Sequence, residues 1–102
     1  MAYTVSNQWN NGFTANVTIT NTGTSTINGW TLVFSFPNGQ QLTSEWSGNF
    51  TQQGAQVTVT NLSYNGSISA GGSTSIGFNA SYNGTNTNPT SFKLNSQQCT
   101  TA

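Results

Sequence analysis

The sequence predicts an all-β protein, a single-domain antiparallel β-sandwich of the jelly-roll or immunoglobulin-like kind. Several short segments alternate apolar and polar residues with the period of a strand, and clusters of Gly, Asn and Pro separate them. No segment has the period of an amphipathic helix, and no exact internal repeat is visible. A chain of 102 residues is the usual size of one domain. We therefore expect residues 1–102 to be one module, with residues 1–2 an added start and residues 100–102 a tail.

The predicted strands are justified by their alternation and by the turns between them. Residues 3–8 are expected to form an edge strand, and residues 13–20 alternate without exception. Further strands are expected at residues 30–36, 56–61, 73–82 and 90–94, after segments rich in Gly, Asn and Pro. The side chains that this alternation turns inward are Phe13, Ala15, Val17, Ile19, Trp30, Leu32, Phe34, Phe36, Val57, Val59, Ile76, Phe78, Ala80, Phe92 and Leu94.

Three aromatic residues do not fit this alternation, because polar and turn-forming residues flank them: Trp9, Trp46 and Tyr64. Trp46 is expected in a loop over residues 42–48, beside Glu45. One exposed ring is ordinary, but three indicate a binding site, and we expect them to form one exposed platform. The alternative is that each ring packs at the rim and caps one end of the sandwich. Trp30 differs, because its position in an inward-facing series predicts a core residue.

The composition excludes most other classes of function. Lys93 and Glu45 are the only charged side chains, and histidine and aspartate are absent. Nucleic-acid binding needs several Lys or Arg side chains, and so does attraction to an anionic membrane surface. Glycoside hydrolysis normally uses two carboxyl groups, a catalytic triad needs a histidine, and zinc or calcium sites need ligands that are missing here. No apolar run is long enough to span a membrane. We expect no catalysis, no cofactor and no metal.

An uncharged surface rich in amides and hydroxyls suits a neutral, hydroxyl-rich partner outside the cell. A pyranose ring has an apolar face of C–H groups on which an aromatic ring can stack, while amides and hydroxyls bond its hydroxyl groups. Outward-facing Asn16, Ser75 and Asn79 lie on strands that can flank such a row. Ordinary solvent-facing polarity explains these three residues equally well.

Several motifs resemble those of family 2 carbohydrate-binding modules. They are residues 7–18 (NQWNNGFTANVT), 27–32 (INGWTL), 34–40 (FSFPNGQ), 64–68 (YNGSI), 71–72 (GG), 76–78 (IGF) and 89–92 (PTSF). The similarity covers nearly the whole chain. It implies an antiparallel β-sandwich attached to a secreted bacterial cellulase or xylanase.

The resemblance also implies roles for individual residues. Trp9, Trp46 and Tyr64 match the three coplanar surface aromatic residues that bind crystalline cellulose in that family. Trp30 matches the buried tryptophan. The positions that match polar residues of the binding face are Asn7, Asn16, Ser44, Ser75 and Asn79.

The resemblance favours the cellulose-binding branch of the family. The xylan-binding branch lacks the loop with the middle tryptophan and has a bulky Arg where this chain has Gly12. The chain departs from the family at Tyr64, where a Trp is common, and at its start. Cys99 matches one half of a disulfide between the two ends, whose other half is missing at Met1-Ala2. We expect a monomer in which the Cys99 thiol is able to link two copies.

Three alternatives remain to the binding of insoluble cellulose. Chitin presents a similar sugar face, and xylan is bound by the other branch of the family. A different class is an ice-binding or surface-adhesion protein, suggested by Thr-x-Thr segments at residues 18–20 and 58–60. Ice binders need a regular Thr array, however, and do not need tryptophans with polar neighbours.

Overall fold

The computed structural model describes residues 1–95 and 97–98, and all of the regular structure in this part of the chain is β. The strands are β1 (Ala2–Trp9), β2 (Gly12–Thr20), β3 (Ile27–Asn28), β4 (Thr31–Ser35), β5 (Gln41–Trp46), β6 (Asn49–Gln53), β7 (Gln56–Thr60), β8 (Ser67–Ile68), β9 (Ser73–Ser81), β10 (Phe92–Leu94) and β11 (Gln97–Gln98). The predicted fold class is therefore confirmed. Cys99, the thiol expected to link two copies, lies outside the described residues.

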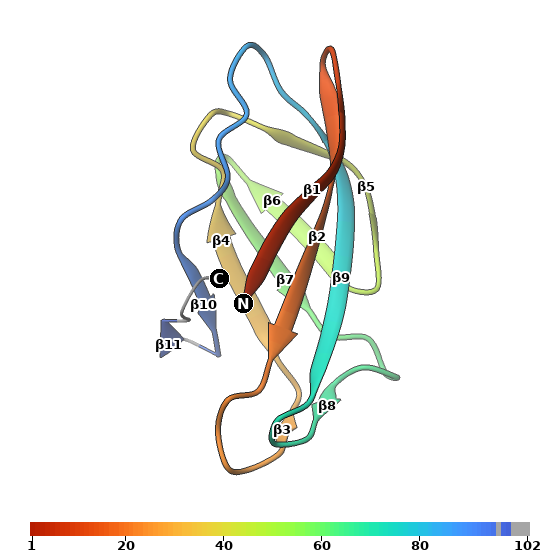
Figure 1. Ribbon diagram of the computed structural model, residues 1–102, viewed down its shortest axis with the longest axis vertical. Helices are drawn as coiled ribbons and strands as arrows, with labels where there is room; N and C mark the ends of the chain where they lie inside the picture. The colour runs from red at the N-terminus through yellow and green to blue at the C-terminus, as the bar shows by residue number, and fades with distance from the viewer. Residues whose placement is uncertain (96, 99–102) are drawn as a thin grey trace.

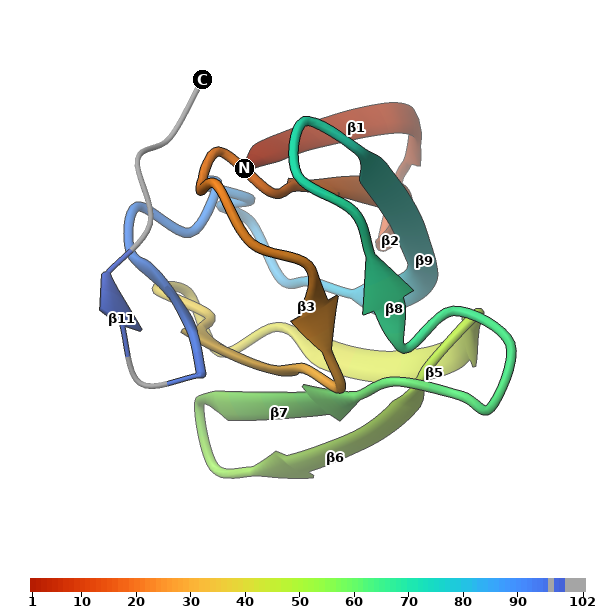
Figure 2. The same cartoon turned by 90° about the horizontal axis from the view of Figure 1, so that it is seen from below.

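Two sheets face each other and form the sandwich (Figure 1, Figure 2). One is a four-stranded sheet in the order β1-β2-β9-β5, and the other is a five-stranded sheet in the order β11-β10-β4-β7-β6. The short strands β3 and β8 pair with each other at one end of the molecule. Neighbouring strands are antiparallel in each sheet. The strands run along the long dimension of a body of 42 × 24 × 24 Å.

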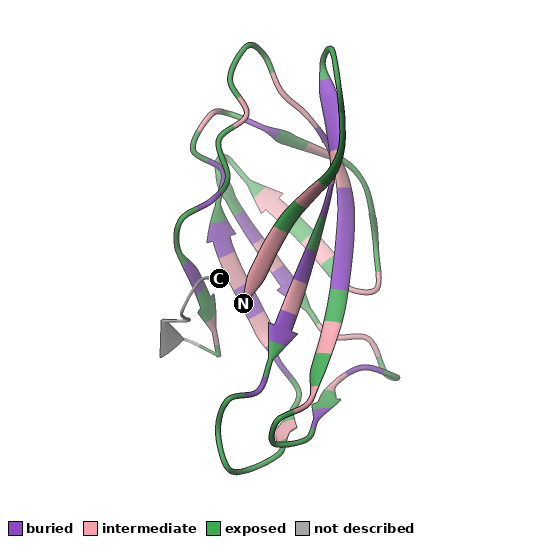
Figure 3. Ribbon diagram, in the orientation of Figure 1, coloured by how far each residue is buried: buried purple, intermediate pink, exposed green. Residues whose placement is uncertain are grey.

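The core consists of the inward side chains of both sheets, and burial alternates along the central strands (Figure 3). The predicted inward residues of β2 are fully buried, and so are those of β7. The phenylalanines meet in the middle: Phe34 lies 5.3 Å from Phe92 and 5.5 Å from Phe36 between ring centroids. The alternation predicted from the sequence is confirmed for these strands; Leu94 alone is only half-buried.

Trp30 is buried as predicted and is also hydrogen-bonded. Only 2% of its surface is exposed, and its Nε1 donates to the backbone oxygen of Asn65 at 2.8 Å. A buried indole N–H without a partner would lose the free energy of its hydration. The backbone N–H of Trp30 is satisfied too, because it donates to Oδ1 of Asn61 at 2.8 Å.

The expectation that Trp46 lies in a loop is wrong, because Trp46 is the last residue of the strand β5, and a second strand, β6, begins three residues later. β5 is an edge strand of the four-stranded sheet, β6 is an edge strand of the five-stranded sheet, and the chain crosses between the sheets at Ser47 and Gly48. Five of the six residues of β5 are exposed. Such a strand lacks the apolar–polar alternation on which sequence-based prediction depends. The short strands β3, β8 and β11 were not predicted for lack of a repeating pattern.

Tyr3 brings a polar atom into the core between the two sheets. Its ring packs against Phe78 and Phe92, with centroid distances of 6.1 and 6.0 Å. Its hydroxyl oxygen is buried and has no hydrogen-bond partner among the described residues. Burial raises the pKa of the Tyr3 hydroxyl, because the phenolate would be poorly solvated there. The buried hydroxyl therefore lowers the stability of the fold compared with a phenylalanine at the same position.

Trp30→Ala should lower the free energy of unfolding by about 3–5 kcal/mol, because it leaves a large cavity and frees the backbone oxygen of Asn65. Urea denaturation followed by circular dichroism measures the change. Thr58→Ala, on the outer side of β7, is a control that should change stability by less than about 0.5 kcal/mol. A Trp30→Ala variant as stable as the parent would show that Trp30 is not a core anchor.

Tyr3→Phe should raise the free energy of unfolding by about 1 kcal/mol, because it removes a buried hydroxyl without a partner. The effect should grow in alkali. Because the pKa of Tyr3 is raised in the folded protein, the unfolded chain ionises first, and the parent loses stability as the pH rises above the ordinary pKa of about 10, a loss that phenylalanine does not share. Denaturation from neutral pH to about pH 11 should show a smaller loss for the variant than for the parent. A destabilised Tyr3→Phe would contradict the assignment.

Candidate functional site: an exposed aromatic face

The three aromatic residues singled out in the sequence are the large hydrophobic side chains that the described structure leaves exposed. Trp9 is 44% exposed, Trp46 is 41% exposed and Tyr64 is 74% exposed. Their surroundings do not bury them as rim caps. The other large aromatic side chains are buried or half-buried.

Trp9 and Trp46 lie on the same face of the four-stranded sheet, on its two opposite edge strands. Trp9 ends β1 and is in register with Gly12 of β2, while Trp46 ends β5 and is in register with Gly77 of β9. Gly77 in turn pairs with Asn16 of β2. Asn16 is four residues from Gly12 along β2, and each residue of an antiparallel strand advances by about 3.4 Å. The two ring positions therefore lie roughly 14 Å apart along the strand direction. A single sugar ring is too small to contact both.

Each indole occupies the space above a glycine on the neighbouring strand. A Cβ on Gly12 would lie 2.5 Å from Nε1, 2.7 Å from Cε2 and 2.8 Å from Cζ2 of Trp9. A Cβ on Gly77 would lie even closer to the same three atoms of Trp46, in the same order. Both glycines are buried although they lie on the solvent side of the sheet, because the indoles cover them. The two rings therefore pack against the sheet in the same way.

This equivalence extends to the strands that carry the rings. Residues 5–9 (VSNQW) correspond to residues 42–46 (LTSEW), and each segment has a register shift at its second residue. Residues 12–16 (GFTAN) of β2 correspond in the same way to residues 77–81 (GFNAS) of β9. A two-fold rotation about an axis normal to the sheet relates the two halves. The face thus contains two copies of one unit, which we call the Trp–Gly units: Trp9 with Gly12, and Trp46 with Gly77.

Polar side chains fill the face between the Trp–Gly units. Thr14 and Asn79 pair across β2 and β9, and the Thr14 hydroxyl donates to Oδ1 of Asn79 at 2.6 Å. Asn7 and Ser44 flank this pair from the two edge strands, and both are exposed. This row offers amide and hydroxyl groups between the two rings.

The two other predicted polar residues lie on the same face. Asn16 is exposed and is in register with Gly77, next to the ring of Trp46. Ser75 lies two residues from Gly77 along β9, and its hydroxyl shares a hydrogen bond of 3.3 Å with that of Thr18. The structure therefore brings Asn7, Asn16, Ser44, Ser75 and Asn79 onto one face with Trp9 and Trp46.

Tyr64 lies in the loop between β7 and β8, and Asn65 attaches this loop to the turn after Trp46. Nδ2 of Asn65 donates to the backbone oxygen of Ser47 at 2.7 Å, and Oδ1 accepts from the backbone N–H of Leu62 at 2.8 Å. Ser47 adopts a φ of 65°, in the left-handed region that non-glycine residues rarely occupy. β5 runs away from Trp9, so the turn at Ser47, to which Asn65 attaches the loop of Tyr64, lies on the far side of Trp46 from Trp9.

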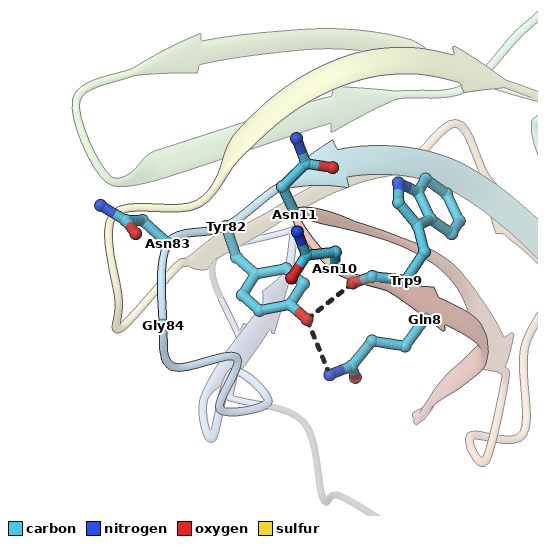
Figure 4. A pocket seen from close by; sticks show the side chains of 7 residues that line it. All are labelled: Gln8, Trp9, Asn10, Asn11, Tyr82, Asn83 and Gly84. Atoms are coloured by element: carbon cyan, nitrogen blue, oxygen red, sulfur yellow. Dashed lines mark hydrogen bonds between the residues drawn. The ribbon is translucent and has the colours of Figure 1, made fainter.

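A polar hollow lies at the other end of the row, beside Trp9 (Figure 4). The Tyr82 hydroxyl donates to the backbone oxygen of Trp9 at 2.7 Å and accepts from Nε2 of Gln8 at 3.1 Å. These bonds hold the end of β1 in place and so fix the backbone that carries the indole. Asn10 and Asn83 also line this hollow and add amide groups to it.

This face offers two exposed indole rings together with amide and hydroxyl groups. Among the described residues, no three His, Cys, Asp or Glu side chains lie together as a metal would require. Glu45 is exposed on β5, and no second carboxylic side chain exists in the sequence. In the described part of the chain there is also no helix long and apolar enough to cross a membrane.

Sequence reasoning missed Gly77 and Asn65 as residues that place the rings. The signal for Gly77 was present, since Gly-Phe occurs at residues 12–13 and again at residues 77–78. It becomes meaningful only when the register places a tryptophan opposite each glycine. For Asn65 the sequence contains no such signal, because its partners Ser47 and Leu62 are chosen by the fold.

A β-sandwich with a row of exposed rings and amides on one sheet is a surface-binding module. The chain belongs to the family 2 carbohydrate-binding modules, since the family model described as "Cellulose binding domain" matches residues 1–99. This confirms the resemblance seen in the motifs and identifies a non-catalytic module.

Relatives of known name and structure agree with this membership. Endoglucanase B of Cellulomonas fimi is 55% identical over 93 residues, which cover 91% of this chain and 9% of that protein. The solution structure of the chitin-binding domain of Chi18aC from Streptomyces coelicolor is 36% identical with a TM-score of 0.71, over 91% of this chain and 86% of that one. The cellulose-binding family 2 domain of ScLPMO10C is 32% identical with a TM-score of 0.67, over 85% and 86%. The chain spans about a tenth of the length of the first relatives it matches.

Asn65→Ala should loosen the loop of Tyr64 and lower the free energy of unfolding by about 1–3 kcal/mol, because it leaves two partly buried backbone groups, the oxygen of Ser47 and the N–H of Leu62, without partners. Amide hydrogen exchange at Leu62 should accelerate, and the backbone of Tyr64 should show greater mobility by NMR relaxation. Asn28→Ala, an exposed asparagine on β3, is the matched control and should change neither. Unchanged exchange at Leu62 in Asn65→Ala would contradict this role.

Proposed function

We propose that this module binds crystalline cellulose through Trp9, Trp46 and Tyr64, with Asn7, Asn16, Ser44, Ser75 and Asn79 as polar partners. The observation that carries the proposal is the pair of equivalent Trp–Gly units on one sheet face. Two equivalent rings on one rigid sheet suit a ligand that is itself flat and repetitive. The exposed loop of Tyr64 extends the row beyond Trp46.

The physical basis is stacking combined with uncharged hydrogen bonding. Each aromatic ring removes apolar area of a sugar face from water, which is favourable by about 25 cal/mol per Å². Amides and hydroxyls between the rings replace the water that the sugar hydroxyls lose. Because Trp9 and Trp46 already stand on paired strands, little conformational freedom is lost there when a surface binds.

The proposed role in a whole protein is to hold an attached catalytic domain on its substrate. Named relatives such as Exoglucanase A of Cellulomonas fimi are much longer than this chain. A tethered glycoside hydrolase would gain a high effective concentration at the solid surface. Such a protein works outside the cell, so we propose secretion as well.

Chitin is the second candidate ligand, and a specific observation favours testing it. The chitin-binding domain of Chi18aC has this fold and is 36% identical to this chain. Chitin presents the same apolar sugar face as cellulose but adds acetamido groups. Xylan is less favoured, because Trp46 and Gly12 match the cellulose-binding branch.

The working form that we propose is a monomer, because one exposed face is enough for a surface ligand. The alternative is a dimer in which Cys99 thiols link two copies, since the space outside the cell is oxidising. Light scattering with and without a reductant distinguishes the two states.

Trp9→Ala and Trp46→Ala should each weaken binding to microcrystalline cellulose by at least about 2 kcal/mol, the loss expected for a central aromatic contact. Both side chains are exposed, so the melting temperature should stay near that of the parent. Pull-down isotherms on cellulose, crystalline chitin and insoluble xylan measure affinity and rank the three ligands.

Gln56→Ala, on the opposite sheet, is the matched control and should bind like the parent. If both tryptophan variants sediment with cellulose as well as the parent does, the aromatic face is not the binding site. Tighter binding to chitin than to cellulose would show that the proposed ligand is wrong, but it would leave the proposed site unchanged.

A further inference from the structure

Gly77 is a buried residue on the solvent side of the four-stranded sheet. The ring of Trp46 is what buries it, since Nε1, Cε2 and Cζ2 of the indole occupy the position that a Cβ would take. No carbon atom fits there while the indole stays where it is. The identity of residue 77 therefore decides where the ring of Trp46 can stand.

We infer that Gly77 sets the position of the Trp46 ring above the sheet and thereby makes the face selective for a flat crystalline surface over a single soluble chain. The inference rests on the proposed function and adds a residue that controls specificity. Gly77 itself need not contact the ligand; it is a positioning residue that acts through Trp46.

The ring, and not the backbone, is the part that must move if residue 77 gains a side chain. Gly77 is paired on both sides, with Asn16 of β2 and with Trp46 of β5. The next residue, Phe78, is fully buried in the core and holds β9 from below. Trp46, by contrast, is 41% exposed on an edge strand and has solvent on its free side. An added methyl group would therefore lift or turn the indole.

Moving one ring matters because the two Trp–Gly units have the same geometry. The indole of Trp9 rests on Gly12 through the same three atoms. Both rings consequently stand at matched positions above the sheet. A crystalline face is rigid and can contact both rings only while they stay matched, whereas a soluble chain can bend to follow a displaced ring.

Gly77→Ala should weaken binding to microcrystalline cellulose by roughly tenfold or more, in line with the loss of a central contact. Its affinity for soluble cellohexaose, followed by NMR titration, should change by less than about threefold. The added methyl group lies on the outer side of the sheet, and it lowers the conformational entropy of the unfolded chain. The melting temperature should therefore not fall. Ser73→Thr adds one methyl group to the same face of β9, away from the rings, and should leave both affinities unchanged.

A double-mutant cycle shows whether the effect passes through the ring. Trp46→Ala with Gly77→Ala should bind cellulose no more weakly than Trp46→Ala alone, because the ring is already gone. The Nε1–H signal of Trp46 should shift in Gly77→Ala, while that of the buried Trp30 stays in place. Additive losses, an unmoved Trp46 signal, or equal losses for both ligands would each overturn the inference.

The outcomes also separate this inference from the proposed function. If Trp46→Ala binds cellulose like the parent, the aromatic face itself is wrong. If Trp46→Ala loses binding and Gly77→Ala does not, only the role of Gly77 is wrong. If Gly77→Ala melts below the parent, recovery in the double variant places the steric conflict at the ring, and no recovery overturns the inference.

Discussion

The contact between Phe13 and Phe78 connects the core of this protein to its exposed face. The two rings meet edge to face at 6.0 Å, and both are fully buried. Neighbouring residues of a strand point to opposite faces of the sheet. Burying Phe13 therefore turns Gly12 outward, and burying Phe78 does the same for Gly77. Because each glycine is in register with a tryptophan, the packing of these two rings between the inner sides of β2 and β9 also determines where the two indoles stand.

The parts of the fold that could be read from the sequence are those with one buried and one exposed face. β2 and β9 alternate because their inner side chains enter the core, so their ends and their orientation were predictable. β5 was not, because an exposed edge strand has no reason to alternate. The exposure of Trp9, Trp46 and Tyr64 followed from their polar neighbours. The glycine beneath each indole did not, since a cross-strand register is a property of the fold.

In this protein, buried amide side chains form the hydrogen bonds that hold the loops in place, a role that charged side chains have in many other proteins. Asn21 is buried, and its Nδ2 donates to the backbone oxygens of Ser25 and Ile68. Gln40 is fully buried, and its Nε2 donates to Oδ1 of Asn86 and to the backbone of Thr87. An amide has both a donor and an acceptor and carries no charge, so its burial costs far less than that of an ion. A chain with only two charged side chains can therefore still provide hydrogen-bond partners for the buried polar groups of its loops.

The two-fold relation between the Trp–Gly units bears on how a polymer lies on this face in the proposed mode of binding. A rotation about the sheet normal exchanges Trp9 with Trp46, so these two rings present the same arrangement to a chain that runs in either direction. A polysaccharide has two different ends, and only features that the rotation does not repeat can distinguish them. One is the difference between Asn7 and Ser44. The stronger one is Tyr64, because beyond Trp9 the described structure has the polar hollow of Figure 4 in place of a third exposed ring. The bond from Asn65 to Ser47, which fixes the Tyr64 loop beside Trp46, therefore also fixes the asymmetry of the site.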